Sequence, residues 1–347
     1  MLLPVWFPGC SKFKENNMRQ REIVGNKVSA IGFGCMNLSS GYGPGPDEAY
    51  GARVLNEALD AGYSFMDTAT VYGLGKNEQL VGKSIGHRRD EFFLASKCGL
   101  RGDANGNREI NGRPEVILES CDASLKRLGV EQIDLYYLHR MDPNVPIEDT
   151  VGAFAQLVDA GKIRYVGLSE ISADILRRAN AVHPIAAVQN EYSLWTRNPE
   201  IALLDTCREL GVTFVAFSPV ARQFLTGKLQ DVTNFHPQDI RVTMPRFQPE
   251  AYSKNLELLE EYANLAQETG CTMAQLAIAW LLERDENIIP IPGTTKLEHM
   301  YENAGADGVR ISPEVMQCLD KLINQNTVVG GRYDDRAEAT VFTENFT

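Results

Sequence analysis

The chain has 347 residues, and single α/β barrel domains commonly run to about 250 residues or more, so length alone does not require two domains. Apolar residues make up 44% and charged residues 23%, which is typical of a globular protein with a large core. The formal net charge of −12 repels a phosphate backbone and an anionic membrane surface, so we expect neither nucleic acid nor a membrane as a partner.

The seven cysteines are scattered and contain no CxxC pair, which predicts neither a disulfide framework nor a zinc site. No apolar run approaches the roughly 20 residues that span a bilayer. Residues 1–10 lack the basic start of a secretory signal. We therefore expect a cytoplasmic protein that binds no metal.

The first elements form one strand-helix unit behind a short extension. Residues 1–17 match no element, and we expect them to be disordered. Residues 18–28 predict a hairpin with Gly25 and Asn26 at its turn. Residues 31–35 predict a buried strand, and residues 47–61 predict a helix that begins at an Asp N-cap and ends at Gly62.

The same alternation continues along the chain. Further strands are predicted at residues 65–68, 92–97, 134–139, 165–169, 186–190, 213–218 and 288–291, with helical periodicity at 115–128, 149–160, 173–181 and 199–210 between them. Several of these helices end in a glycine that precedes the next strand, as a left-handed C′ position favours.

Eight strand-helix units predict parallel strands closed into a single (β/α)8 TIM barrel over residues 18–325, followed by a C-terminal tail at 326–347. An open doubly wound sheet would carry a GxGxxG turn after its first strand, but only Gly32 and Gly34 are present there. We interpret both as close backbone packing. The long irregular segment at residues 221–249 follows the seventh strand, and such loops are usually functional or mobile.

Four polar residues follow apolar strands: Asp67 and Tyr72 after the second, Lys97 at the end of the third and His139 at the end of the fourth. In a parallel barrel they would converge at the C-terminal face, where active sites of this fold lie. Lys97 would favour ionisation of Tyr72 and bring its pKa down toward neutral pH, while Asp67 holds Lys97 charged. Tyr72 could then protonate a carbonyl oxygen that His139 positions. Each residue alone could equally be structural, as an ion pair or a packing group.

Six segments resemble the aldo-keto reductase family in order and spacing, from about Arg21 to Leu322. They are Met66-Asp67-Thr68-Ala69 with Tyr72-Gly73, Ala95-Ser96-Lys97, Leu138-His139, Val166-Gly167-Leu168-Ser169, Val188-Gln189 and Ala216-Phe217-Ser218-Pro219. The segments at 167–170, 182–189 and 291–297 look closest to the branch that contains perakine reductase, fungal pyridoxal-reductase-like and plant auxin-induced-like proteins. The resemblance implies the same roles for Asp67, Tyr72, Lys97 and His139.

The resemblance also implies an NADPH site, although NADH is not excluded. Ser169 and Gln189 would hold the nicotinamide carboxamide, Phe217 would stack on its ring, and Ser218, Val220 and Arg222 would line the pyrophosphate. Thr294 and Lys296 would approach the 2′-phosphate, and Glu302 and Asn303 the adenine. Where relatives usually carry Arg at the phosphate, this chain has His299, a weaker phosphate partner, and Ala221 and Gln223 stand where relatives often carry glycine.

The substrate pocket would be formed by Met36, Asn37, Trp195 and the loop at 221–249, with Trp195 either a pocket wall or a packing residue. We expect an enzyme that reduces a small aldehyde or ketone to the alcohol. The alternative is a weakly active or non-catalytic cofactor-binding subunit that senses redox state within a larger complex. The substrate and the oligomeric state stay open.

Overall fold

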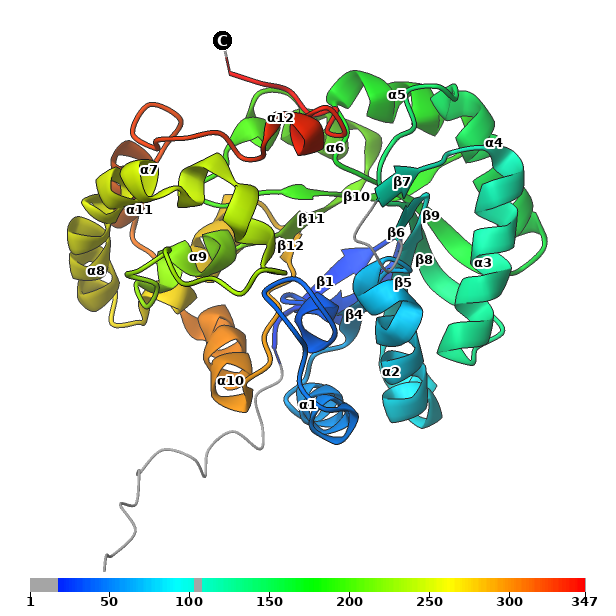
Figure 1. The fold of residues 1–347 in the computed structure, drawn as a ribbon, viewed down its shortest axis with the longest axis horizontal. Coiled ribbons are helices and arrows are strands. Elements are labelled where there is room, and N and C mark those ends of the chain that lie inside the picture. Colours follow the sequence, from blue (N-terminus) through cyan, green and yellow to red (C-terminus); the bar gives the residue numbers. More distant parts are fainter. Residues whose placement is uncertain (1–17, 103–107, 347) are drawn as a thin grey trace, which may run out of the picture.

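Eight parallel strands lie at the centre of the molecule, in a computed structural model that describes residues 18–102 and 108–346. Each strand is hydrogen-bonded to the next in the order β3 (Phe33–Gly34), β4 (Phe65–Asp67), β5 (Phe93–Cys98), β8 (Ile133–Leu138), β9 (Ile163–Ser169), β10 (Ile185–Glu191), β11 (Thr213–Phe217) and β12 (Ile288–Pro290). Figure 1 shows these strands curving around one centre.

The two ends of the sheet meet through backbone hydrogen bonds. The N–H of Gly32 donates to the oxygen of Pro290 at 2.9 Å, and that of Gly34 to the oxygen of Pro292 at 3.2 Å. A Cβ on Gly34 would lie 2.9 Å from the oxygen of Ile291, so this close approach requires glycine. The predicted close packing of both glycines is confirmed, and the fold is the predicted single-domain (β/α)8 barrel.

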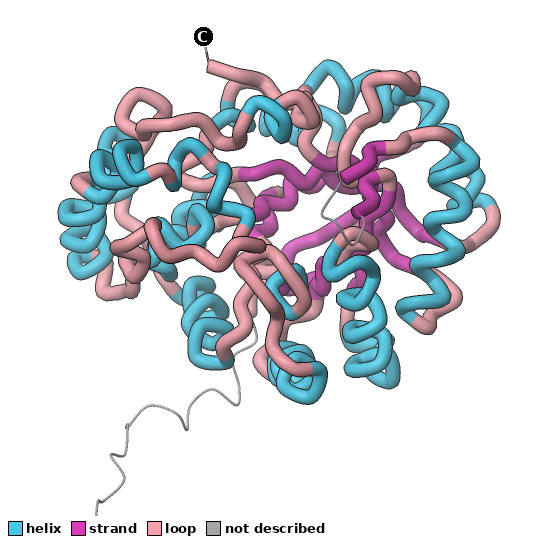
Figure 2. The backbone as a smooth tube through the Cα atoms, in the orientation of Figure 1, coloured by secondary structure: helices cyan, strands magenta, loops and turns pink. Residues whose placement is uncertain are grey.

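Helices surround the strands, as Figure 2 shows. One follows each barrel strand: α1 (Glu48–Asp60), α2 (Lys76–Ile85), α3 (Pro114–Leu128), α4 (Ile147–Asp159), α5 (Ala173–Val182), α6 (Leu203–Leu210), α9 (Met273–Arg284) and α10 (Leu297–Gly305). The carboxylate of Asp47 accepts a hydrogen bond from the N–H of Tyr50 at 2.8 Å, which confirms the predicted N-cap of α1. The helix predicted from Pro199 begins only at Leu203, because Ala202 leaves helical geometry with φ of −153°.

An antiparallel hairpin, β1 (Gln20–Ile23) and β2 (Asn26–Ser29), packs against the residues inside the barrel. Ile23 and Val28 are fully buried and contact a cluster of inward-facing strand residues. The two turn residues are Val24 and Gly25, both with positive φ, whereas we predicted Gly25 and Asn26. Positive φ at both central positions is typical of a type I′ two-residue turn, and Asn26 pairs with Ile23 in the ladder instead.

Several elements were not predicted. The strands β6 (Leu100–Gly102) and β7 (Arg108–Ile110) form a small antiparallel pair. Between β11 and α9 lie the 3₁₀ helices η6 (Ala221–Thr226), η7 (Ile240–Thr243) and η8 (Pro245–Phe247), then α7 (Pro249–Leu256) and α8 (Leu258–Glu268). Further 3₁₀ helices are η2 (Met36–Leu38), η3 (Tyr72–Gly75), η4 (Gly86–Glu91), η5 (Asn198–Glu200) and η9 (Ala306–Gly308).

The C-terminal segment folds back onto the barrel after α11 (Pro313–Leu322) and carries α12 (Asp335–Glu338). The N–H of Phe342 donates to the oxygen of Glu170 at 3.0 Å, directly after β9. Figure 1 shows α12 and the C-terminus along one side of the barrel. The extension predicted at residues 1–17 lies outside the described residues. No helix within the described ranges is long and apolar enough to cross a membrane.

Candidate active site

A cavity of about 1170 Å³ lies where the barrel strands end. Its volume exceeds the roughly 300 to 1,000 Å³ of a pocket for one small ligand, so there is room for a dinucleotide and a second molecule. The residues that follow successive strands line it, including Met36, Tyr72, His139, Ser169, Gln189, Phe217 and Thr294. This is the face that carries the active site in barrels of this kind.

Lys97 is fully buried beneath this cavity at the end of β5. Its ammonium donates to a carboxylate oxygen of Asp67, to the backbone oxygen of Thr68 at 2.9 Å and to the Tyr72 hydroxyl at 3.4 Å. The other carboxylate oxygen of Asp67 accepts from the amide nitrogen of Gln189 at 2.8 Å. Lys97 therefore joins a buried carboxylate to a phenol at the cavity surface.

The His139 ring packs edge-on against Tyr72, with the ring centroids 5.7 Å apart. Both side chains line the cavity, so a carbonyl group entering there would meet a phenol and an imidazole together. The structure thus brings into one cluster the four residues that the sequence placed after three different strands: Asp67, Tyr72, Lys97 and His139.

The pKa values of this cluster differ in one respect from the prediction. Burial alone would lower the pKa of Lys97, but the Asp67 carboxylate and the Tyr72 phenol raise it above its ordinary value, so the ammonium stays charged. Burial raises the pKa of Tyr72, and the charge of Lys97 reduces this rise without reversing it. We had predicted a lowered pKa for Tyr72. In the protein alone, the phenol therefore keeps its proton at neutral pH.

A second group of predicted residues lines the cavity beside the cluster. Ser169 ends β9 and Gln189 lies two residues before the end of β10, while Phe217, Ser218 and Val220 lie at or just after the end of β11. Met36 and Asn37, predicted for the substrate, lie in η2 and line the same cavity. The structure thus collects hydroxyl, amide and aromatic groups within reach of Tyr72.

The far end of the cavity is cationic. Thr294, Lys296, His299, Glu302 and Asn303 line it, as their predicted roles at the adenosine require. Lys228, which we did not predict, also lines it and reaches across from the loop after β11. Its ammonium lies 3.5 Å from Nε2 of His299 and 3.8 Å from a carboxylate oxygen of Glu302. Burial and the neighbouring ammonium of Lys228 lower the pKa of His299.

Arg222 lines the cavity, but its guanidinium is engaged in a buried ion-pair network. It donates to the Glu191 carboxylate at 3.2 Å and to the Tyr333 hydroxyl at 3.0 Å. Arg332 of the C-terminal segment joins the network, 2.7 Å from Glu170 and 3.1 Å from Glu191. Burial alone would raise the pKa of Glu191, but the surrounding guanidinium groups, that of Arg222 foremost, lower it to about 2.

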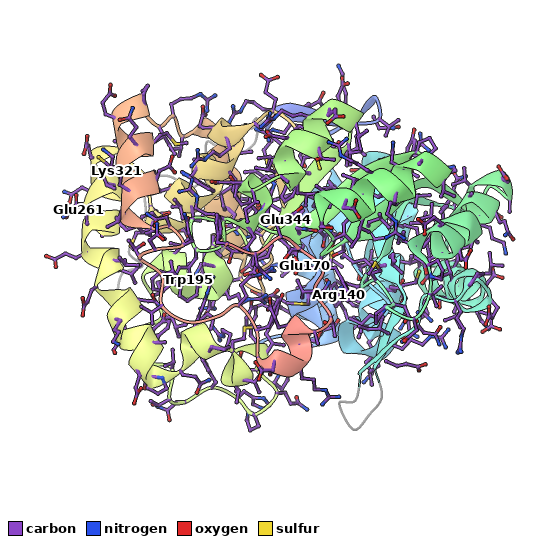
Figure 3. The ribbon with its side chains drawn as sticks, turned by 90° about the horizontal axis from the view of Figure 1, so that it is seen from above. Arg140, Glu170, Trp195, Glu261, Lys321 and Glu344 are labelled. Carbon is purple, nitrogen blue, oxygen red and sulfur yellow. The ribbon has the colours of Figure 1, made fainter. Side chains whose placement is uncertain are left out.

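Trp195 is not among the residues that line the cavity, which corrects its assignment to the substrate pocket. It is 4% exposed and stacks on Phe224 with ring centroids 4.2 Å apart. Its backbone oxygen accepts a hydrogen bond from Arg246. Figure 3 shows Trp195 well apart from Arg140 and Glu170, toward the side that holds α8. The aromatic partners of the long loop draw this side chain into packing, which sequence alone left open.

Residues 30–324 match the model of the aldo/keto reductase family. The chain belongs to the aldo/keto reductase family. It is therefore a member of an oxidoreductase family, as the motifs in its sequence predicted. A relative from Glycine max named probable aldo-keto reductase 1 is 44% identical over 310 residues, which cover 89% of each chain. An aldo-keto reductase of Schizosaccharomyces pombe, whose name specifies NADP(+), is 43% identical over 93% of this chain and 97% of its own.

Solved structures of aldo-keto reductases have the same fold. A glycerol dehydrogenase from Gluconobacter oxydans superimposes with a TM-score of 0.80 at 29% identity, over 87% of this chain and 94% of its own. An aldo-keto reductase from Bacillus halodurans gives a TM-score of 0.75 at 28% identity, over 92% of this chain and 99% of its own.

Two features of this aldo/keto reductase cavity had no clear signal in the sequence. The loop after β3 bridges to the loop after β11, where the N–H of Ile240 donates to the oxygen of Gly41 at 2.9 Å and the backbones of Tyr42 and Asp239 pair. The second feature is the network around Arg222. Its members come from segments up to 162 residues apart, as in the contact between Glu170 and Arg332, and each reads as an ordinary surface charge.

Proposed function

We propose that the protein reduces an aldehyde or ketone to the alcohol with NADPH, and that Tyr72 donates the proton. The observation that carries the proposal is the position of Lys97, buried between the Asp67 carboxylate and the Tyr72 hydroxyl beneath a cavity large enough for cofactor and substrate. A lysine fully removed from solvent needs compensation, and a carboxylate on one side and a phenol on the other provide it.

Each residue of the cluster has a role in this reaction. The raised pKa of Tyr72 keeps the phenol loaded with its proton until negative charge develops on the carbonyl oxygen. Lys97 stabilises the phenolate that remains after the transfer, and Asp67 keeps Lys97 charged and in place. His139, edge-on to the Tyr72 ring, hydrogen-bonds the carbonyl oxygen and stabilises its developing charge.

The chemistry of the cavity wall fits NADPH, which when bound supplies the hydride. Ser169 and Gln189 offer hydroxyl and amide groups suited to a carboxamide, and Phe217 offers an aromatic face for a ring. The opposite end carries the charges of Lys228 and Lys296 beside His299, as a phosphate requires. The NADP(+) in the name of the Schizosaccharomyces pombe relative supports the same choice.

In this proposal Lys228 compensates for the histidine at position 299. Its ammonium lies 3.5 Å from the imidazole, so a permanent charge stands where a neutral imidazole alone would bind phosphate weakly. Arg222 binds the pyrophosphate only if the phosphates draw its guanidinium away from Glu191 or share it.

The test is an NADPH-oxidation assay against 4-nitrobenzaldehyde, pyridoxal and a diketone, with NADH in parallel. We expect aldehyde-dependent oxidation of NADPH and formation of the alcohol. Tight NADPH binding without turnover on any of these carbonyl compounds would instead support a cofactor-binding, redox-sensing subunit. No binding of either dinucleotide would contradict both functions.

A further inference from the structure

Arg140 directly follows His139 and lines the same cavity. One guanidinium nitrogen, Nη1, donates to the backbone oxygen of His139 at 2.7 Å and to the hydroxyl of Ser169 at 3.4 Å. The other two nitrogens have no hydrogen-bond partner within residues 18–102 and 108–346, and no carboxylate in those ranges lies within 4.0 Å of the guanidinium. Two N–H-bearing nitrogens therefore remain available to a ligand.

In this respect Arg140 differs from Arg222 and Lys228, whereas Lys296 and Arg336, which also line the cavity, have no carboxylate within 4.0 Å in the described ranges either. Arg222 is paired with Glu191, and Lys228 is paired with Glu302. Figure 3 shows Glu170 near Arg140, but the Glu170 carboxylate binds Arg332 at 2.7 Å. In a chain with a net charge of −12, an arginine without an acidic partner at a cavity is a candidate binding group for an anion.

The surroundings of Arg140 add apolar walls to this charge. Leu100 and Ile110, from the pair β6 and β7, line the cavity together with Val341 of the C-terminal segment. The hydrogen bond from Phe342 to the backbone of Glu170 brings that segment next to Ser169, which Arg140 contacts. A molecule bound there would meet apolar side chains and one guanidinium.

We propose that Arg140 binds an anionic group of the substrate, so that the preferred substrates are aldehydes or ketones that also carry a carboxylate or a phosphate. This inference rests on the proposed carbonyl reduction. The phosphates of the cofactor belong at the end with Lys228 and Lys296, whereas Arg140 contacts Ser169, where the uncharged carboxamide is expected. The anion at Arg140 is therefore supplied by the substrate.

The first test compares a charged aldehyde with its neutral ester. We expect wild type to reduce 4-carboxybenzaldehyde with a kcat/KM at least about ten-fold above that of methyl 4-formylbenzoate. Arg140→Gln should lower this ratio about ten- to a hundred-fold, as the loss of a charge-assisted hydrogen bond predicts. Because both substrates are measured on each variant, a general change in rate cancels. If kcat/KM for 4-formylphenyl phosphate, divided by that for methyl 4-formylbenzoate, exceeded the ratio for 4-carboxybenzaldehyde, phosphate would be the favoured anion.

Two further variants make the comparison specific. Arg140→Lys keeps the charge and should keep part of the preference for the acid. Arg53→Gln removes an exposed guanidinium from α1, outside the cavity lining, and should leave the ratio at its wild-type value. Equal ratios in wild type and Arg140→Gln would overturn the proposal, as would an equal loss in Arg53→Gln.

A binding measurement separates this inference from the proposed reaction. The product 4-(hydroxymethyl)benzoate and its methyl ester are titrated into the NADPH-loaded protein, and no turnover is needed. We expect the acid to bind more tightly than the ester in wild type and not in Arg140→Gln, even if no aldehyde is reduced. If Arg140→Gln instead weakens NADPH binding as much as it weakens binding of the acid, Arg140 serves the cofactor and the inference is wrong.

Discussion

The cluster around Tyr72 and the network around Arg222 are both buried groups of charged side chains at the same end of the barrel, but they are built in different ways. Asp67, Lys97 and His139 come from the ends of neighbouring parallel strands, so the register of the sheet brings them together. Arg222 and Arg332 come from a long loop and from the C-terminal segment, and long-range packing positions them. The cluster around Tyr72 can therefore be expected once the barrel is predicted, whereas the network around Arg222 depends on how the long loop and the C-terminal segment pack.

The two regions also differ in backbone strain. Ala221, Arg222 and Gln223 have φ values of 50°, 53° and 82°, a run of left-handed residues without a glycine. Left-handed backbone costs a non-glycine residue about 1–2 kcal/mol, and such strain often marks a functional segment. The loop after β11 therefore stores strain beside the cavity. Asp67 and Lys97 lie in regular sheet, and near Tyr72 one non-glycine residue, Leu74, is left-handed, with φ of 57°.

The largest expected effect is on turnover, at the strand-borne cluster. Tyr72→Phe removes the proton donor and should lower kcat by about 10²- to 10⁴-fold while the free energy of unfolding changes little. Steady-state rates of carbonyl reduction measure this. The matched control is Tyr165→Phe, which removes a phenol that binds Asn26 in the N-terminal hairpin, away from the cavity, and should leave kcat near that of wild type.

The pH profile of wild type sharpens the same prediction. Because burial raises the pKa of Tyr72, kcat/KM for reduction should not fall between pH 7 and pH 9 and should decline only near or above the ordinary tyrosine value of about 10. If kcat/KM fell between pH 7 and pH 9 while the protein stayed folded and still bound NADPH over that range, the transferred proton would come from a group other than Tyr72.

The network around Arg222 should affect stability rather than the chemical step. Glu191→Gln leaves the guanidinium groups of Arg222 and Arg332 buried without their shared carboxylate, and should cost about 3–5 kcal/mol of unfolding free energy. The pKa of Glu191 is about 2 in the folded state and near 4.5 when unfolded. Its contribution is therefore present above pH 4.5 and is lost as the pH falls toward 2.

Denaturant unfolding of both proteins at several pH values checks this prediction. Wild type should lose stability more steeply than Glu191→Gln between pH 4.5 and pH 2, so the difference between them should shrink there. A difference that is constant across this range would show that Glu191 acts through packing and not through its charge.

The next effect concerns the choice of cofactor. Lys228→Gln should weaken NADPH binding about ten- to a hundred-fold and leave NADH binding nearly unchanged, because the proposal places this ammonium at the 2′-phosphate, which NADH lacks. Fluorescence titration of both dinucleotides measures the ratio. His299→Gln should have a smaller effect at pH 7, since the lowered pKa of His299 leaves the imidazole mostly neutral.

The lowered pKa of His299 also shifts the pH range in which its charge can help to bind NADPH. With its pKa lowered, His299 gains its proton only below its ordinary value of 6.5, so its help to NADPH binding should appear as the pH falls below that value. His299→Arg should tighten NADPH binding and remove the pH dependence. Equal affinity in wild type and His299→Arg would show that Lys228 and Lys296 alone satisfy the phosphate.

The smallest effect is at the strained loop. Ala221→Gly relieves a left-handed alanine and should raise the unfolding free energy by about 0.5–1 kcal/mol after the entropy cost of glycine. Ala202→Gly, in the loop before α6, where φ is negative, should instead be neutral or destabilising. A loss of stability in Ala221→Gly equal to that in Ala202→Gly would mean that the loop is not strained.

The same contrast explains what the sequence could predict. The barrel, the position of Asp67, Tyr72, Lys97 and His139, and part of the cavity lining, such as Ser169, Gln189 and Phe217, were predicted, because each depends on a strand end or on a short motif. Trp195 was named as a pocket candidate that could equally be a packing residue, and its stacking on Phe224, which lies 29 positions further along the chain, shows that it is a packing residue. Lys228 and Arg140 were not predicted, because their roles depend on neighbours that only the folded chain provides. Lys228 lies beside His299, and Arg140 has no carboxylate within 4.0 Å in the described ranges.

The most direct test of the account is a single turnover with NADPH bound in excess protein and 4-nitrobenzaldehyde added. Wild type should oxidise the bound NADPH and form one alcohol for each cofactor. Tyr72→Phe should bind NADPH with the same affinity and react at least about 100-fold more slowly. A Tyr72→Phe protein that reacts at the wild-type rate would contradict the assignment of the proton to Tyr72, and with it the role of the buried Lys97.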